Sequence, residues 1–241
     1  MLQDWMIRLK LGGGALDVEV DPTSIAGRIR DRKRWESWKA IARNRVLPKT
    51  VKAGLNRLVR VTRRFDIDDD SKFDLVSFER GETYLKMEDV WKHKEDLQNS
   101  STYQQVLKSL EDNNIYRHKK YEVTEKSEII SMIKSCYSDL LVSLDEEGYI
   151  PGKKSSFATG GMGLAIVWRD GSLWHEVGAT HRLVAARLVG LQRGFPLRIV
   201  AAHHDWLGEQ GIRKLSDISK LPRALERVDG VLAIQAPGSG R

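Results

Sequence analysis

The stretch LAIVWRDGSLWHEVGATHR, which covers residues 164–182, decides the fold of the second half of the chain. Its first five residues are apolar, as in a buried strand. The next three, Arg169-Asp170-Gly171, are typical of a tight turn, and a second strand is predicted over residues 172–177. Gly178-Ala179-Thr180 then predicts another turn, because glycine and small residues interrupt regular structure. The stretch therefore indicates a β-hairpin followed by a turn.

The residues on either side extend this hairpin into a larger unit. A short helix is predicted over residues 181–189, and Phe195-Pro196 opens a third strand over residues 197–202. Ahead of the hairpin, the longest helix of the chain is predicted from Thr124 to about Glu147. The order helix, strand, strand, helix, strand predicts a small mixed sheet in an α+β protein.

The long helix carries a broad apolar stripe, which we expect to pack against the strands over residues 164–168 and 197–202. Cys136, the only cysteine of the chain, lies on this stripe, and its position predicts a small buried hydrophobic residue. A single cysteine also excludes an intramolecular disulfide. The stripe consists of Ile129, Ile130, Met132, Ile133, Cys136, Tyr137, Leu140, Leu141 and Leu144.

The N-terminal half is predicted to be helical, and its charge is unevenly distributed. Residues 1–65 hold 16 Lys and Arg against 6 Asp and Glu, a net charge of +10, whereas residues 66–150 carry a net charge of −9. We expect basic helices to begin at Ser24 and Thr50, each acting as a helix cap. The asymmetry indicates either that residues 24–64 bind nucleic acid or another polyanion, or that they dock on the acidic middle.

The acidic middle is predicted to be mostly helical and polar. The carboxylates over residues 66–74 are interpreted as a solvated linker, because the run lacks the turn glycine and the bidentate glutamate of a calcium-binding loop. A capping box beginning at Ser101 predicts the start of a helix. The histidines of the chain lack the spacing of a dedicated metal site, so no metal held by protein ligands alone is predicted.

Composition places the chain in a broad class. Apolar residues make up 41% and charged residues 30% of the 241 positions, which is ordinary globular usage and excludes wholesale disorder. No apolar run approaches the roughly 20 residues that a bilayer requires, and no apolar core of a signal peptide follows Met1. We therefore expect a soluble, cytoplasmic protein without a membrane span.

The turn Gly178-Ala179-Thr180-His181-Arg182 is the strongest candidate binding site. Small residues let backbone N–H groups converge at a helix N-terminus, where partial positive charge favours phosphate. His181 and Arg182 can add side-chain donors.

The order of these motifs resembles the ParB/sulfiredoxin superfamily over about residues 139–206. In this superfamily the turn binds nucleoside triphosphates, and its members include a CTP-dependent partition protein, an ATP-dependent sulfinic-acid reductase and a kinase of free serine. The resemblance implies that Gly178, Ala179, Thr180, His181 and Arg182 hold ATP or CTP, with Mg²⁺ accompanying the nucleotide. It is carried by Leu141-Val-Ser-Leu144, Glu147-Gly148-Tyr149, residues 164–167, Gly171, the turn itself, Ala185-Ala186, Gly190, residues 195–200, His204 and Trp206.

The sequence departs from the superfamily at the turn. Thr180 stands where the sulfiredoxin nucleophile is a cysteine, so sulfinic-acid reduction by that route is not expected, since a hydroxyl lacks thiolate nucleophilicity. Gly178 stands where an aspartate is usual. Glu176, two residues upstream on the same strand face, is the carboxylate that can replace it.

The resemblance also implies the catalytic residues. Kinase-like members carry a catalytic glutamate where Glu147 ends the long helix, so Glu147 is a candidate general base for phosphoryl transfer. The alternative for Glu147 is a solvated carboxylate at a helix end. Glu176 and His181 are the other candidate catalytic residues.

These observations predict four regions: a basic helical arm over residues 1–65, an acidic helical region over 66–122, a ParB/sulfiredoxin-like nucleotide-binding unit over 123–206, and a C-terminal helix with a frayed tail over 207–241. The expected activity is ATP-dependent phosphoryl transfer to a small-molecule or protein acceptor, or nucleoside-triphosphate hydrolysis. The alternative is a non-catalytic nucleic-acid-binding module that uses the basic helices. A scaffold whose nucleotide site has decayed is a third hypothesis.

Overall fold

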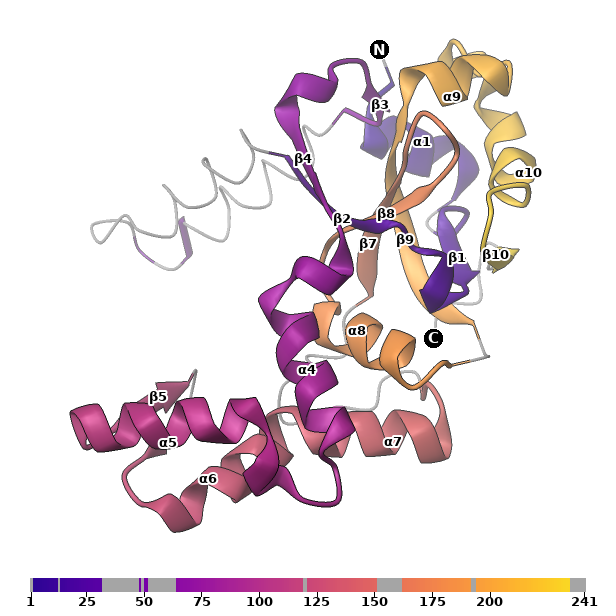
Figure 1. The fold of residues 1–241 in the computed structure, drawn as a ribbon. Helices are drawn as coiled ribbons and strands as arrows, with labels where there is room; N and C mark the ends of the chain where they lie inside the picture. The colour runs from indigo at the N-terminus through magenta and orange to yellow at the C-terminus, as the bar shows by residue number, and fades with distance from the viewer. Residues whose placement is uncertain are drawn as a thin grey trace. The chain divides into compact units, whose positions relative to one another are not determined.

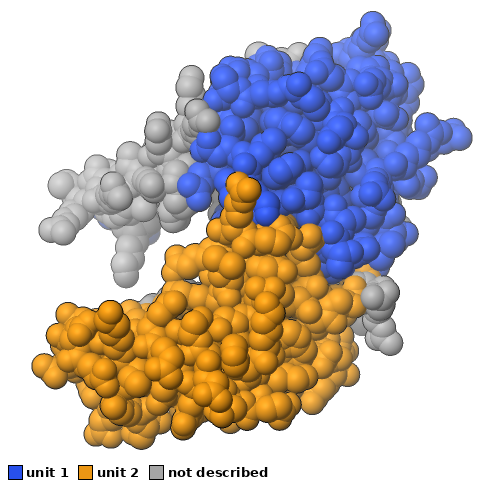
Figure 2. Space-filling model, in the orientation of Figure 1, with its two compact units in different colours: residues 1–77, 162–178, 196–241 blue, residues 78–161, 179–195 orange. Residues whose placement is uncertain are grey.

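The computed structural model shows an α+β protein whose described residues form two compact units (Figure 2). Unit 1 comprises residues 1–77, 162–178 and 196–241, and unit 2 comprises residues 78–161 and 179–195. Each unit is therefore assembled from segments that are far apart in the sequence. The structure describes residues 2–12, 14–31, 48, 50–51, 64–118, 121–150, 162–191 and 194–234.

Unit 1 is built on a mixed sheet, to which eight strands contribute within the described residues (Figure 1). Its order is β10-β1-β9-β7-β8-β2-β4, with β3 pairing with β9. β7 and β8 are antiparallel, whereas β7 and β9 are parallel, and so are β2 and β8. The strands are β1 (Asp17–Val20), β2 (Gly27–Asp31), β3 (Asp66–Ile67), β4 (Phe73–Val76), β7 (Gly163–Val167), β8 (Leu173–Val177), β9 (Phe195–His203) and β10 (Val231–Ile234).

The predicted hairpin is present as β7 and β8. Gly171 has a φ of +83° and donates its N–H to the Trp168 carbonyl over 3.0 Å, while the Asp170 carboxylate accepts from the Ser172 N–H over 2.9 Å. Glycine suits this position because it adopts positive φ without a Cβ clash. One face of the sheet around the hairpin is a core of Ile29, Ile67, Ile166, Trp168, Val200 and Ala201.

Short helices complete unit 1: α1 (Asp4–Leu11), α9 (His204–Glu209) and α10 (Leu221–Leu225). Both α1 and α10 contact the 3₁₀-helix Leu215–Lys220, whose first carbonyl accepts from Lys10 Nζ over 3.0 Å. A short helix near the C-terminus is thus present as predicted, but β10, which pairs with β1, was not expected. Residues 235–241, the predicted frayed tail, lie outside the described residues.

The N-terminal half is not uniformly helical, and the helix expected to begin at Ser24 is wrong for residues 24–31. Pro22–Ser24 form a 3₁₀-helix and residues 27–31 form β2. Ile25, Gly27 and Ile29 are buried while the residues between them are more exposed, which is the two-residue period of a strand. Most of the remaining basic arm, residues 32–47 and 52–63, lies outside the described residues.

The acidic run over residues 66–74 is not a solvated linker either. β3 pairs with β9 in parallel, and β4 pairs with β2. Asp66 is buried, and its carboxylate accepts a hydrogen bond from the Leu2 N–H over 3.1 Å. The prediction was wrong because a carboxylate can lie on a buried strand when hydrogen bonds satisfy its oxygens, as the bond from Leu2 does for Asp66.

Unit 2 is mainly helical. The predicted long helix is present as α6 (Lys126–Ile133), a five-residue π-helical turn (Lys134–Ser138) and α7 (Asp139–Glu147). It begins at Lys126 because the Glu128 carboxylate accepts from the N–H groups of Thr124 and Glu125. The other elements are α4 (Glu82–Lys92), α5 (Ser101–Asn113), β5 (Tyr116–His118), β6 (Tyr121–Val123) and α8 (Thr180–Leu188).

The apolar stripe of the long helix forms the core of unit 2. Eight of its nine members are buried, Ile130 being the partly exposed one. Its neighbours within the unit are helices, since α5 packs on α6, α4 on the π-helical turn and α8 on α7, whereas we expected strands. Cys136 is 1% exposed, with its Sγ 3.6 Å from Met132 Sδ, as expected for a small buried hydrophobic residue. Among the described residues, no helix has both the length and the apolar character needed to cross a membrane.

Candidate functional site at the turn before helix α8

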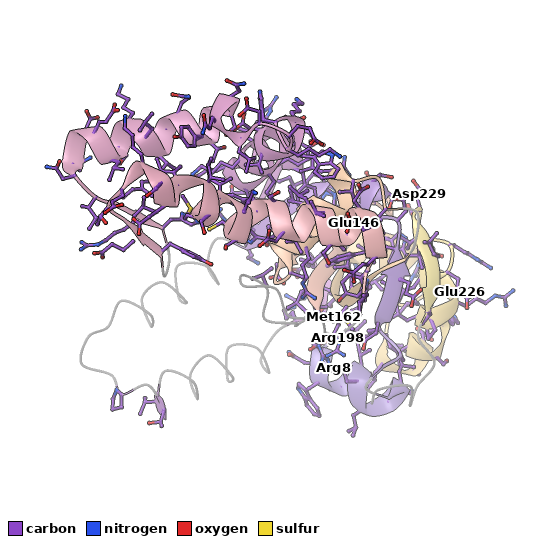
Figure 3. All side chains as sticks on the ribbon, turned by 90° about the horizontal axis from the view of Figure 1, so that it is seen from below. Arg8, Glu146, Met162, Arg198, Glu226 and Asp229 are labelled. Carbon is purple, nitrogen blue, oxygen red and sulfur yellow. The ribbon has the colours of Figure 1, made fainter. Side chains whose placement is uncertain are left out.

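The turn between β8 and α8 contains two successive residues in the left-handed region. Gly178 has a φ of +80°, and Ala179 has a φ of +50° and a ψ of 17°. A Cβ at position 178 would lie 3.1 Å from the Met162 carbonyl oxygen (Met162 is labelled in Figure 3). Glycine therefore suits this position both because of the positive φ and because there is little space for a side chain. Ala179 has no such freedom, and its left-handed backbone is disfavoured by roughly 1–2 kcal/mol.

The backbone changes hand within this turn. Ala179 is left-handed and Thr180 begins the right-handed helix α8. Successive residues of opposite hand turn their neighbouring N–H groups into a concave arrangement that suits an anion. The helix adds partial positive charge at the same end. Binding of an anion by the N–H groups of residues 179–181 stays a prediction.

His175 holds the turn from the preceding strand. Its Nε2 lies 2.6 Å from the Gly178 carbonyl oxygen, and its side chain is fully buried. Burial lowers the pKa of His175 to about 4, so the imidazole is neutral near pH 7. Because a carbonyl only accepts, Nε2 carries the proton that is donated to Gly178. We did not predict this role for His175 from the sequence, although its position two residues after apolar Leu173 indicates that both side chains lie on the same face of β8.

Arg182, in the first turn of α8, is directed at an aromatic side chain. It is 5% exposed, and its Nη1 donates to the Tyr149 hydroxyl over 3.0 Å. The guanidinium carbon also lies 5.8 Å from the centroid of the Tyr149 ring, within cation–π range. The Tyr149 ring in turn contacts the Phe195 ring edge-on, with the centroids 5.1 Å apart. Contact of Arg182 with a phosphate stays a prediction.

The contact between Arg182 and Tyr149 also locates Glu147. Glu147 is the last residue of α7 and is exposed, next to Glu146, which is labelled in Figure 3. It lies two positions before Tyr149 in the sequence, so its Cα lies at most about 7 Å from that of Tyr149. The C-terminal end of α7 is thereby brought beside the first turn of α8 in unit 2.

The other two candidate catalytic residues flank the turn. Glu176 lies on β8, two residues before Gly178, and is partly exposed. His181 is the second residue of α8 and is also partly exposed. Among the described residues, no group of three or more His, Cys, Asp or Glu side chains is arranged to hold a metal ion.

Comparison of the chain with protein-family models, with curated proteins and with solved structures finds no match. The fold and site described above therefore stand on this chain's own geometry.

Proposed function

We propose that the chain is a ParB/sulfiredoxin-like protein that binds a nucleoside triphosphate, ATP or CTP with Mg²⁺, at residues 178–182 and transfers its terminal phosphoryl group. The observation that carries this proposal is the left-handed Ala179 directly before the N-terminus of α8. A residue with a Cβ occupies that conformation only when its surroundings impose it, and such strain is concentrated at functional sites.

The phosphates would be held mainly by the backbone. The N–H groups of Ala179, Thr180 and His181 are the donors, and the positive end of α8 complements the charge. The imidazole of His181 adds a side-chain donor. Arg182 contributes directly only if its guanidinium turns from Tyr149, because it is nearly enclosed. Mg²⁺ would arrive with the nucleotide and bridge its phosphates, which is how this ion is usually held.

The chemical step requires a base for the acceptor. In the proposed reaction, an acceptor hydroxyl oxygen attacks the γ-phosphorus, its proton passes to the Glu147 carboxylate, and the bond to the β-phosphate oxygen breaks to release the nucleoside diphosphate. With water as acceptor the same steps give hydrolysis. Glu147 is favoured because Tyr149 and Arg182 bring the end of α7 to the first turn of α8. Glu176 and His181 are the competing candidates.

Two substitutions at position 179 test the binding site. Aspartate and asparagine both cap helices and both tolerate the left-handed region, so neither variant should lose stability. Only Ala179→Asp places a negative charge where the phosphates would lie. We expect Ala179→Asp to weaken ATP or CTP affinity by tenfold or more and Ala179→Asn to weaken it less, in calorimetric titrations with Mg²⁺. Equal affinities for the two variants, or no binding of either nucleotide by the unaltered protein at millimolar concentration, would refute the proposal.

A second pair of variants tests the base. Glu147→Gln should abolish turnover and leave nucleotide affinity unchanged, because it removes a proton acceptor and keeps the shape of the side chain. Glu176→Gln is the comparison, since it makes the same change on β8. If Glu176→Gln is the inactive variant, the base is on β8 instead.

A second candidate function is nucleic-acid binding, which the +10 net charge of residues 1–65 favours. If about six of these side chains reach phosphates, log affinity for duplex DNA should fall against log salt with a slope near −5. A slope near zero, or no binding at low salt, would exclude it.

A further inference from the structure

Unit 2 contains a cavity that the turn before α8 does not use. Its volume is about 220 Å³, and its walls come from α4, α5, β5 and the long helix. The lining residues are Lys86, Thr102, Gln105, Val106, Tyr116, Met132 and Tyr137. All of them belong to one compact unit, so the cavity is a property of that unit alone.

The cavity lies beside the π-helical turn of the long helix. Tyr137 is in this turn, and Met132 is two residues before it. Such turns interrupt a regular helix at a cost and occur frequently at functional sites. In this π-helical turn the Tyr137 side chain is buried, and its hydroxyl lies 3.3 Å from His118 Nε2. Two independent features, a cavity and an interrupted helix, thus coincide.

The inner wall of the cavity is largely apolar, and the residues that line it are uncharged. Val106, Met132 and Tyr137 are buried, and the Thr102 hydroxyl donates to the Asp89 carboxylate over 2.6 Å. Burial and nearby negative groups raise the pKa of Tyr137, which keeps its hydroxyl protonated. This wall therefore suits an apolar body rather than a charged group.

The outer part of the cavity is polar and carries one positive charge. Gln105 is exposed and Lys86 is partly exposed, whereas none of the lining residues is acidic. Lys86 Nζ does bond Glu82 Oε1 over 2.6 Å, but the Glu82 side chain is 81% exposed. Exposed pairs of this kind contribute little, so a ligand carboxylate can share or replace this partner.

We propose that this cavity binds a small organic anion, an aromatic carboxylate, with the carboxylate on Lys86 and the ring against Val106, Met132 and Tyr116. The charge of the lining selects an anion, and the apolar inner wall selects a flat apolar body. The cavity volume is about that of seven water molecules in the liquid. A single ring with one carboxylate fits this volume, because each of its covalently bonded atoms occupies less space than a separate water molecule. Small ligand sites commonly combine an apolar pocket with few polar groups in this way.

Benzoate is the probe for this proposal, and the unaltered full chain is the protein to use. The ε-methyl resonance of Met132, assigned by its loss in Met132→Leu, should shift saturably as benzoate is added. Benzamide, which has nearly the same shape and no charge, should bind at least about tenfold more weakly, as expected when a charge-assisted hydrogen bond is lost. Equal affinity for the two probes, or no saturable shift at millimolar benzoate, would overturn the proposal.

A matched pair of variants tests the role of Lys86. Lys86→Met keeps the apolar stem and removes the charge, and it should weaken benzoate at least about tenfold. Lys92→Met is the control, because Lys92 also lies on α4 and also pairs with a glutamate four residues earlier, yet does not line the cavity. Lys86 is partly exposed and Lys92 is exposed, and melting temperatures equal to that of the unaltered protein would show that both variants fold. Equal weakening by the two variants would mean that benzoate senses only the overall charge, which would refute the site.

Discussion

The hydroxyl of Tyr149 accepts a hydrogen bond from Nη1 of Arg182 over 3.0 Å, and this contact joins the end of α7 to the start of α8. Arg182 is 5% exposed, so its guanidinium depends on protein partners instead of water. A buried charged group that loses a partner is expensive. The contact therefore stabilises unit 2 and at the same time sets the position of the candidate base Glu147.

Replacing Tyr149 by phenylalanine isolates this hydrogen bond. The ring and its contact with Phe195 are kept, while the acceptor for Arg182 is removed. We expect the free energy of unfolding to fall by about 1–3 kcal/mol, measured by urea denaturation. Tyr84→Phe, on partly exposed Tyr84 of α4, is the control and should change stability by less than about 0.5 kcal/mol. If the two variants are equally stable, the contact contributes nothing.

Replacing Ala179 by glycine tests the strained backbone of the turn. Glycine relieves a left-handed conformation that is unfavourable by about 1–2 kcal/mol for alanine, and it also makes the unfolded chain more flexible, which opposes the gain by about 0.4–1 kcal/mol. The expected result is a protein as stable as the original or up to about 1.6 kcal/mol more stable. By contrast, Ala185→Gly, in the interior of α8, should lose about 1 kcal/mol or more. A clear loss with Ala179→Gly would show that position 179 is not left-handed in solution.

The elements that the sequence predicts well are those with strong local signals. The hairpin of β7 and β8 follows from an apolar run and an Asp-Gly turn, and the long helix follows from a stripe with helical spacing. In both cases the pattern lies within about 25 contiguous residues, so no distant partner is needed to recognise it.

β2 could not be predicted because its signal is non-local. Arg28 and Arg30 alternate with buried residues there, and the strand is defined by pairing with β4 and β8, far along the chain. The candidate site shows the same limit. The motif predicts a turn at Gly178, but the close approach of the Met162 backbone to Gly178 joins parts of the chain that are not adjacent in sequence. The contact between Arg182 and Tyr149 depends on the packing of α7 on α8.

A half-buried ion pair in unit 1 offers a test of the sheet. Asp17 on β1 accepts two hydrogen bonds from Arg198 on β9, through Nε and, over 2.6 Å, through Nη2 (Arg198 is labelled in Figure 3). Asp17 is buried and Arg198 is partly exposed, so the coupling should be smaller than for a fully enclosed pair. A double-mutant cycle with Asp17→Asn and Arg198→Met should give about 1–3 kcal/mol of coupling.

The exposed pair of Arg117 and Glu122 is the control for this cycle. Its Nε to Oε2 distance is 2.8 Å, yet both side chains are more than half exposed. Solvent screening should reduce its coupling to less than about 1 kcal/mol. Similar coupling energies for the two pairs would mean that Asp17 is not buried in solution.

The neutral, buried His175 predicts how stability depends on pH. Its pKa is about 4 in the folded protein, against 6.5 when exposed, because burial disfavours the imidazolium. Between these values the unfolded chain binds more protons than the folded protein, so the free energy of unfolding falls as pH is lowered from about 6.5 to 4. The full loss should be about 3 kcal/mol. His203, whose pKa burial also lowers, contributes in the same direction.

Urea denaturation at intervals between pH 4.5 and 7.5 measures this dependence. His175→Gln keeps a side-chain N–H for the Gly178 carbonyl and has no group that titrates in this range, so stability should vary less with pH even though the variant is less stable throughout. His204→Gln, at an exposed histidine of α9, should change the pH dependence less than His175→Gln does, because it acts only through its charge near His203. A pH dependence unchanged by His175→Gln would show that the unaltered imidazole titrates normally, and hence that His175 is not enclosed beneath the turn.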